Sequence, residues 1–229
     1  MAITRNFAMS PEEFKAVMPL PRGCAWMSCH FSEDGLRDLP ESLPEGSMLI
    51  LDDSIPPKEI CPEKILSQLT EAVSRLSCEA VLLDFQKPGC PGLIHLTDLL
   101  QKGLSCPVGV SLLYGKETDG PVFLPLLPAH KALKDWLAPW HGREIWLEVG
   151  PAPELATVTG KGTHFSVPSP PLASCPHRHE ALNCHYGIRL KDSEILFTLC
   201  RTCDDLKHLT EEAENLGVTR TIGLYQELF

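Results

Sequence analysis

The stretch EAVLLDFQ, residues 79–86, decides the fold expected for this chain of 229 residues. Four apolar residues, 80–83, run into an acid, an aromatic residue and an amide, and Lys-Pro-Gly at 87–89 then breaks the run. A short, continuous apolar run of this kind is typical of a strand buried on both faces of a parallel sheet. Open α/β sheets and β/α barrels place their sites at the carboxyl ends of such strands. The stretch therefore predicts a buried strand with a site beside Asp84 and Gln86.

Segments on both sides of this stretch have the patterns of further strands and helices. A helix is expected at 61–77, where Ile65, Leu69 and Val73 recur at helical spacing, and another at 92–103. Two further helical patterns occupy 129–137 and 203–216. The other expected strands are 23–31, 47–53, 106–114, 120–127, 142–149, 194–200 and 218–225.

Eight strands with interleaved helices predict an α/β fold, a compact and incomplete TIM-like (β/α) barrel in which several crossovers lack a helix. The strands at 23–31 and 120–127 are weak and could be loops, which leaves an open, doubly wound, mostly parallel sheet as the alternative. One domain is expected over residues 1–229. Residues 1–22 are expected to be an N-terminal lead-in. Residues 150–184, with six of the 21 prolines, are expected to be an excursion loop.

The composition and charge of the chain indicate which kinds of partner to expect. A net charge of −10 without a basic cluster argues against nucleic acid. No apolar run approaches the length of a membrane span, and residues 1–6 lack the apolar core of a signal peptide, so we expect a cytoplasmic protein without a membrane partner. The ten cysteines are then expected to be thiols. Because glycine-rich phosphate loops are absent, no cofactor is expected. The oligomeric state does not follow from the sequence.

A barrel would bring polar residues at the strand ends to one rim, and several acids are among them. Neighbouring residues of a strand point to opposite faces, so Asp84 and Gln86 share one side, whereas Asp52 and Asp53 cannot both face the rim. Carboxylates with aromatic and amide side chains suit a carbohydrate, although any single acid could instead cap a helix or solvate a loop. The expected rim residues are His30, Asp52, Asp53, Asp84, Gln86, Tyr114, Glu148, Tyr225, Gln226 and Glu227.

The stretch at 79–86 resembles the strand motif of the chitinase-like glycoside hydrolases of family 18, written DGxDxDxE. In this alignment Asp84 takes the third Asp of the motif and Gln86 takes the catalytic Glu. The other functional positions hold Glu79, Ala80 and Leu82, so Asp84 alone keeps its residue type. The resemblance covers these eight residues and the general plan of a barrel. It implies a β/α barrel with a small-molecule or carbohydrate ligand.

The departure at Gln86 bears on catalysis. In the family, the Glu donates a proton to the glycosidic oxygen, and the neighbouring Asp holds the acetamide of the substrate so that it attacks the anomeric carbon. An amide has no dissociable proton near neutral pH, so Gln86 can hydrogen-bond a sugar but cannot act as a general acid.

Two versions of the site follow. In a rewired hydrolase, Glu148 or Glu227 would be the acid, and Asp84 would orient the substrate or stabilise an oxocarbenium-like transition state. In a sugar-binding protein without activity, the same residues would only hydrogen-bond the ligand. In both versions the expected ligand-binding residues are Gln86, His30, Asp52, Asp53, Tyr114 and Tyr225.

A zinc or thiol protein is a third possibility. Two thiols and three imidazoles lie between Cys175 and His185, and these are zinc-preferred ligand types, but their spacing matches no standard zinc finger. Cys200 and Cys203 form a CxxC at a strand-to-helix junction, where a helix N-terminus lowers a thiol pKa. The simpler interpretation is that Thr202 is the N-cap of a helix with acids in its first turn. No residue is assigned as a metal ligand.

Overall fold

The structure is a computed structural model, and its contacts divide the chain into two compact units. The first unit comprises Met1–Pro125, Gly142–Glu148 and Val218–Gln226, and the second comprises Leu126–His141, Val149–Gly217 and Glu227–Phe229. The residues described are 2–32, 35–54, 60–88, 90–169 and 174–228. The prediction that residues 1–229 form one domain stays a prediction, because a unit defined by its contacts need not fold by itself.

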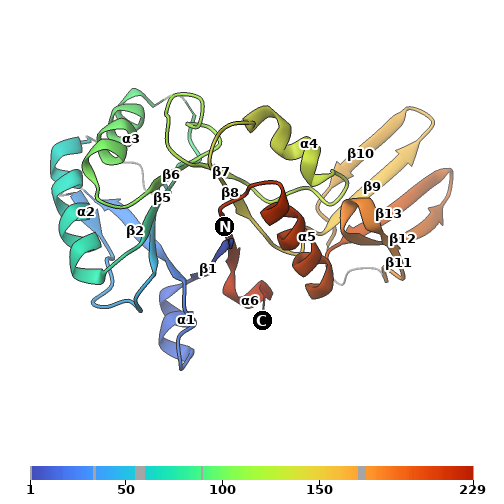
Figure 1. Cartoon of the computed structure of the whole chain (residues 1–229). Helices are drawn as coiled ribbons and strands as arrows, with labels where there is room; N and C mark the ends of the chain where they lie inside the picture. The colour runs from blue at the N-terminus through green and yellow to red at the C-terminus, as the bar shows by residue number, and fades with distance from the viewer. Residues whose placement is uncertain (1, 33–34, 55–59, 89, 170–173, 229) are drawn as a thin grey trace. The chain divides into compact units, whose positions relative to one another are not determined.

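The described strands of the first unit form a closed parallel barrel of eight strands (Figure 1). They follow one another around the barrel in chain order, and β1 closes it by pairing in parallel with both β14 and β2. The predicted TIM-like barrel is confirmed, and the open doubly wound sheet is wrong. The barrel strands are β1 (Thr4–Met9), β2 (Cys24–Ser32), β4 (Met48–Asp52), β5 (Ala80–Asp84), β6 (Val108–Ser111), β7 (Val122–Leu124), β8 (Ile145–Glu148) and β14 (Arg220–Leu224).

Two segments differ from the predicted set of barrel strands. Residues 1–22, expected to be a lead-in, contain β1. Residues 194–200, counted as a barrel strand, instead form β13 (Glu194–Cys200), which pairs antiparallel with two strands of the second unit. The apolar run of β13 suits either kind of sheet, so composition did not reveal that this strand lies outside the barrel.

The first unit has few crossover helices, as the short chain requires. They are α1 (Pro11–Ala16), α2 (Pro62–Leu76) and α3 (Pro91–Gly103), and the short strand β3 (Gly35–Arg37) pairs antiparallel with β2 outside the barrel. The predicted helices at 61–77 and 92–103 are α2 and α3.

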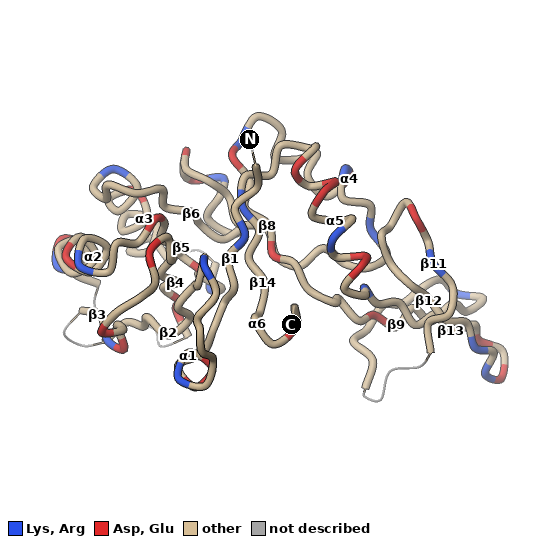
Figure 2. The backbone as a smooth tube through the Cα atoms, turned by 60° about the horizontal axis from the view of Figure 1, so that its bottom comes forward, with Lys and Arg blue, Asp and Glu red and all other residues tan. Residues whose placement is uncertain are grey.

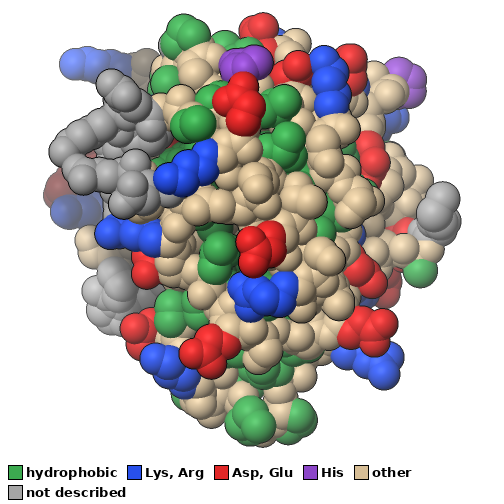
Figure 3. All heavy atoms as spheres, turned by 90° about the vertical axis from the view of Figure 1, so that its left-hand side faces the viewer, with side chains coloured by type: hydrophobic (Ala, Val, Ile, Leu, Met, Phe, Trp, Pro, Cys, Tyr) green, Lys and Arg blue, Asp and Glu red, His purple; other side chains and the backbone are tan. Residues whose placement is uncertain are grey.

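The packing of α2 and α3 follows their sequence pattern. Their apolar faces join the outward residues of β2, β4, β5 and β6 in one buried cluster. Charged residues of both signs lie on α1 and α2 (Figure 2), and the face that carries α2 and α3 shows acidic and basic side chains interspersed (Figure 3). The buried residues of α2 are Ile65, Leu69, Ala72, Val73 and Leu76.

Inward side chains fill the barrel up to the carboxyl ends of its strands. Trp146 is fully buried, and the Arg220 guanidinium lies 5.1 Å from the centroid of its ring. Gly109 of β6 faces this ring so closely that an added Cβ atom would overlap Trp146. The interior therefore is a packed core and not a channel. Its other members include Ala8, Ala25, Met48, Ile50, Ala80, Leu82, Phe123 and Ile222.

The second unit is built on a five-stranded antiparallel sheet in the order β10-β9-β13-β12-β11. Its strands β9 (Glu154–Thr159), β10 (Gly162–Ser166), β11 (His177–His179) and the start of β12 (Cys184–Lys191) lie in residues 150–184, expected to be an excursion loop. The helices α4 (Leu133–Leu137) and α5 (Cys203–Asn215) belong to this unit, and the short α6 (Tyr225–Leu228) ends the described chain. Among the described helices, none combines the length and apolar character needed to cross a membrane.

Candidate functional site

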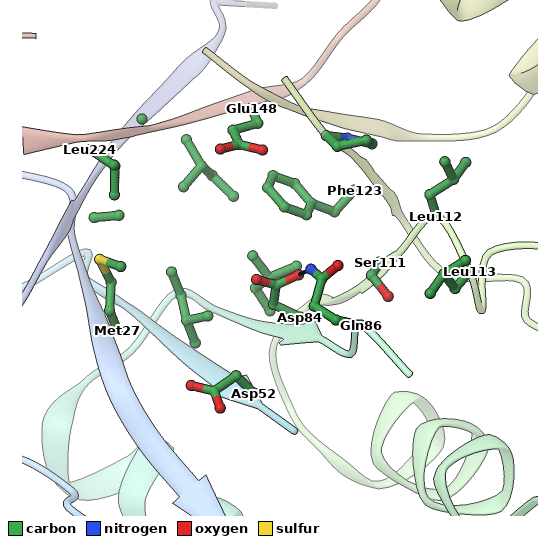
Figure 4. Close-up of a pocket in the computed structure, with 16 residues that line it drawn as sticks. Met27, Asp52, Asp84, Gln86, Ser111, Leu112, Leu113, Phe123, Glu148 and Leu224 are labelled. Carbon is green, nitrogen blue, oxygen red and sulfur yellow. Dashed lines mark hydrogen bonds between the residues drawn. The ribbon is translucent and has the colours of Figure 1, made fainter. Parts of the chain in front are cut away.

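A cavity of about 310 Å³ opens at the carboxyl ends of the barrel strands in the first unit. Its polar lining residues are Asp52 at the end of β4, Asp84 at the end of β5, Gln86 just beyond it, Ser111 at the end of β6 and Glu148 at the end of β8. Figure 4 shows Asp84 and Gln86 beside each other, with Glu148 and Phe123 directed into the same space. The cavity lies where the rim site was predicted.

The end of β5 supplies the central pair of the cavity. Gln86 Nε2 donates a hydrogen bond to Asp84 Oδ1, so the amide and the carboxylate form one unit. Phe85, between them, points the other way and packs against Phe31 and Tyr114 in the buried helix-side cluster. Alternation along the strand therefore explains why Asp84 and Gln86 share the cavity.

The carboxyl group of Asp84 is held in a partly dehydrated setting. Burial raises its pKa above the ordinary value, the hydrogen bond from Gln86 offsets part of this, and the negative charges of Asp52 and Asp53 raise it further. Asp84 therefore takes up a proton at a higher pH than an exposed aspartate does.

The imidazole of His30 lies against the carboxyl group of Asp52 beside the cavity. His30 Nδ1 lies 2.9 Å from Asp52 Oδ2, and the other oxygen of Asp52 accepts a hydrogen bond of 2.8 Å from the Ser54 backbone N–H. Asp52 lines the cavity, whereas His30 lines a separate hollow with Trp26 and Asp38. In this arrangement His30 can orient Asp52.

Asp53 is only 2% exposed and holds the loop that follows β5. Its Oδ1 accepts the backbone N–H of Gln86 at 2.9 Å, and its Oδ2 accepts that of Lys87 at the same distance. Asp52 therefore faces the cavity and Asp53 does not, as the alternation along the strand predicted. The position of Asp53 suits a positioning residue for Gln86.

Replacing Asp53 with alanine should lower the free energy of unfolding by about 2 kcal/mol, because the backbone N–H groups of Gln86 and Lys87 both lose their buried, charged acceptor. Urea denaturation followed by circular dichroism measures the change. Asp98→Ala is the matched control, since Asp98 pairs with Lys102 on the exposed face of α3. Equal stability of the two variants would show that Asp53 does not hold the loop.

The tyrosines and Glu227, also predicted at the rim, are not in the lining of this cavity. Tyr114 is 1% exposed, and its hydroxyl donates to the Lys87 carbonyl at 2.5 Å. Tyr225 begins α6, and Glu227 belongs to the second unit, where burial raises its pKa. Asp52, Asp84, Gln86 and Glu148 are thus brought together, whereas His30, Asp53, Tyr114, Tyr225 and Glu227 are not among the residues that line the cavity.

The sequence reasoning missed several residues that line the cavity. Ser111 ends β6, whereas the predicted strand ran on to Tyr114, so the strand-end rule selected Tyr114 instead. The Ser111 hydroxyl donates to the Phe85 carbonyl at 2.6 Å. The apolar residues of the lining gave no signal that separates them from core residues. These include Met27, Ile50, Leu82, Phe123 and Leu224.

The cysteine and histidine motifs do not assemble a metal site in the part of the chain that the structure describes. His185 Nδ1 lies 2.6 Å from Asp205 Oδ2, and Cys184 is fully buried. Burial, together with the neighbouring Cys175, raises the pKa of Cys200 to about 12. A redox thiol needs the opposite shift, so this geometry does not support the zinc or thiol alternative.

Comparison with known proteins supports the fold. No protein-family model matches the chain, and none of the curated proteins matches it. Solved structures do match it. A family-18 N-acetylglucosaminidase from Paenibacillus barengoltzii has a TM-score of 0.65 and 10% identity, over 99% of this chain and 98% of that one.

Two further structures match at 8% identity. The chitinase-like agglutinin of Robinia pseudoacacia has a TM-score of 0.61, over 100% of this chain and 96% of that one. A family-18 chitinase of Cycas revoluta has a TM-score of 0.60, over 98% and 95%. It is a double mutant, with one glutamate replaced by glutamine, in complex with (GlcNAc)4. The chain therefore has the barrel fold of the family-18 glycoside hydrolases, and at this identity the likeness is one of structure alone.

Proposed function

We propose that the barrel binds a carbohydrate in the cavity at the carboxyl ends of its strands and does not cleave it. The observation that carries the proposal is the Gln86 side chain, which lies in the cavity and is hydrogen-bonded to Asp84. An amide at this point donates and accepts hydrogen bonds with sugar hydroxyls, but it has no proton to give to a glycosidic oxygen.

The composition of the cavity suits a sugar. Asp52, Asp84 and Glu148 offer carboxylate oxygens to hydroxyl groups, and Phe123 with Leu224 offers apolar surface to the C–H faces of a ring. Binding sites for small ligands commonly combine an apolar wall with a few placed polar groups. A volume of about 310 Å³ is at the small end of ligand pockets, so a long oligosaccharide would extend beyond the cavity.

Two of the structural neighbours support a binding role for this fold. One is described as an agglutinin, which is the name of a binding protein. The other is the chitinase mutant in complex with (GlcNAc)4, one of whose two substitutions replaces glutamate with glutamine. A barrel of this kind with a glutamine in place of a glutamate therefore can hold an oligosaccharide, and (GlcNAc)4 is a suitable first probe.

We expect (GlcNAc)4 to bind the wild-type chain and Asp84→Ala to weaken the binding at least tenfold, because a hydrogen bond to a charged group contributes about 1.5–3 kcal/mol. Isothermal titration calorimetry measures both affinities. The matched control is Asp119→Ala, which removes an exposed aspartate of the same unit outside the cavity lining. Binding that is equally strong in Asp84→Ala would place the sugar elsewhere, and no binding to a panel of neutral oligosaccharides would refute the proposal.

Catalysis is tested separately with a chromogenic glycoside of an N-acetylglucosamine oligomer. The expected result is no release of chromophore above the buffer rate at any pH between 4 and 8. Turnover that disappears in Glu148→Gln or Glu227→Gln would overturn the non-catalytic part of the proposal and assign the acid role to that residue. The binding part would then still stand on the calorimetry.

A further inference from the structure

We propose that the second unit carries a binding site of its own, which takes a small planar aromatic ring bearing a hydroxyl group. The site is a pocket of about 340 Å³ on one face of the five-stranded sheet. All of its lining residues belong to the second unit. This inference is independent of the function proposed for the barrel.

The strand register explains how the hollow forms. Ala156 of β9 pairs with Phe165 of β10 on one side and with Phe197 of β13 on the other, so all three side chains point to the same face. Neighbouring strands lie about 4.8 Å apart, which places the two phenylalanines about 10 Å apart across the small alanine. The His130 imidazole stacks on Phe165 and takes up part of this width, so the room for a ligand ring is the rest of the pocket, beside the imidazole and over Ala156 and Phe197.

The walls of the pocket are aromatic and apolar. Phe165, Tyr186 and Phe197 supply three aromatic rings, and Leu182 and Leu199 are among the apolar residues that line it with them. Aromatic pairs gain from offset-stacked and edge-to-face contacts beyond the area they bury, so these walls favour a planar aromatic ligand over an aliphatic one of equal size.

One polar group in the pocket is held in a fixed orientation. His130 Nδ1 lies 2.9 Å from both carboxylate oxygens of Glu154, and the His130 backbone N–H donates to the same carboxylate at 3.0 Å. The imidazole also stacks on Phe165, with ring centroids 3.9 Å apart. In the neutral ring, Nδ1–H donates to Glu154 and Nε2 keeps its lone pair. With Nδ1 engaged by Glu154, Nε2 is the ring nitrogen left for a ligand, and a phenolic hydroxyl can donate to it when the imidazole is neutral.

The pocket is open to a ligand at its edge. Ile188 is 51% exposed and Phe165 is 39% exposed, although both line the hollow. Ile188 pairs with Phe197 in the same row of the sheet. Substitution of Ile188 therefore can change the mouth of the pocket at little risk to folding.

The test uses 4-ethylphenol as the probe in NMR titrations of the full chain, with ethylbenzene and 4-ethylcyclohexanol as comparators. We expect saturable binding of 4-ethylphenol with a Kd on the order of 1 mM, which is usual for a ligand of this size. Both comparators should bind about five-fold more weakly, ethylbenzene because it lacks the hydroxyl and the cyclohexanol because it lacks the flat ring.

Three variants locate the site. Ala156→Leu fills the pocket and should weaken binding of 4-ethylphenol at least tenfold. Ile188→Lys, at the mouth of the pocket, should weaken it about five-fold, and it serves as the test if Ala156→Leu proves unstable. His130→Phe keeps the stacked ring but removes the acceptor, so it should bring the phenol to the affinity of ethylbenzene. The matched control is Thr157→Leu, which adds the same side chain on the opposite face of β9.

The outcomes are separable. No saturable binding, or binding unchanged by both Ala156→Leu and Ile188→Lys, would overturn the site. Equal affinity for 4-ethylphenol and ethylbenzene in the wild-type chain would overturn the role of His130 and, with it, the hydroxyl in the proposed ligand class. Loss of (GlcNAc)4 binding in the barrel would leave these results untouched.

Discussion

Replacing Gly109 with alanine is expected to lower the free energy of unfolding by about 3 kcal/mol, because overpacking inside a filled core forces strain on its neighbours. A Cβ atom added at Gly109 would overlap Cε3 and Cζ3 of Trp146, which is fully buried. The ring cannot withdraw easily, since Trp146 Nε1 donates to Glu144 at 3.1 Å and the Arg220 guanidinium lies over the ring. Urea denaturation monitored by tryptophan fluorescence and circular dichroism measures the loss.

The control for Gly109 is Gly160→Ala, since an added Cβ there would meet no atom within 4 Å. A double mutant isolates the contact. Trp146→Leu is itself destabilising, but adding Gly109→Ala to it should cost much less than in the wild-type background, because the overlapping ring atoms are gone. Additive losses in the two backgrounds would contradict the steric explanation.

Asp205→Ala is expected to lower the free energy of unfolding by about 3 kcal/mol, because it leaves the polar groups around a buried carboxylate without their acceptor. The Asp205 side chain is fully buried near the start of α5. It accepts hydrogen bonds from His185 Nδ1 at 2.6 Å, Arg178 Nε at 3.1 Å and the Thr202 backbone N–H at 2.9 Å. The carboxylate thus ties α5 to β11 and β12.

The pH dependence gives this prediction a second measurement. Burial alone would raise the pKa of Asp205, but the hydrogen bonds from Thr202, His185 and Arg178 outweigh it and lower the pKa to about 2. A carboxyl group with a lowered pKa stabilises the fold above its ordinary pKa of 3.8, and this contribution is lost as the pH falls toward 2.

The stability difference between wild type and Asp205→Ala should therefore shrink by about 2 kcal/mol between pH 5 and pH 2. The neighbouring Asp204 is the control, since its side chain is 83% exposed and Asp204→Ala removes only a surface pair with Lys207. A difference for Asp205→Ala that stays constant with pH would mean that its carboxylate is not the stabilising group.

The barrel could be predicted because most of its strands are continuous apolar runs that end in polar residues. The missed strand, β1, breaks that rule at Asn6, which is 1% exposed. Asn6 can be buried because its side chain donates to the Gly23 carbonyl at 3.0 Å and accepts from Arg220 at 2.6 Å. Neither partner is near in the sequence, so a local pattern gives no sign that this polar residue lies inside a strand.

Local sequence patterns predicted the cavity at the strand ends only in part, for the same reason. Alternation of side chains correctly predicted that Asp84 and Gln86 lie on one side and that Asp52 and Asp53 do not. Both predictions depend only on residues that are close in the sequence. Tyr114 was predicted at the rim from its position after a strand, yet its ring packs on Phe85 and its hydroxyl reaches the Lys87 carbonyl. Where a side chain turns after a strand ends depends on the neighbouring loop, which the strand's own sequence does not describe.

The closure of the barrel by β1 and β14 sets the order in which the chain can fold. The hydrogen bond from Arg220 to Asn6 joins residues 214 positions apart, and the parallel pairing of Thr4 with Arg220 spans a similar length. One edge of β1 therefore has no partner until β14 has been synthesised, and during that time it presents unpaired backbone groups. Completion of this barrel therefore waits for the synthesis of β14, and the growing chain must be protected from edge-to-edge association until then.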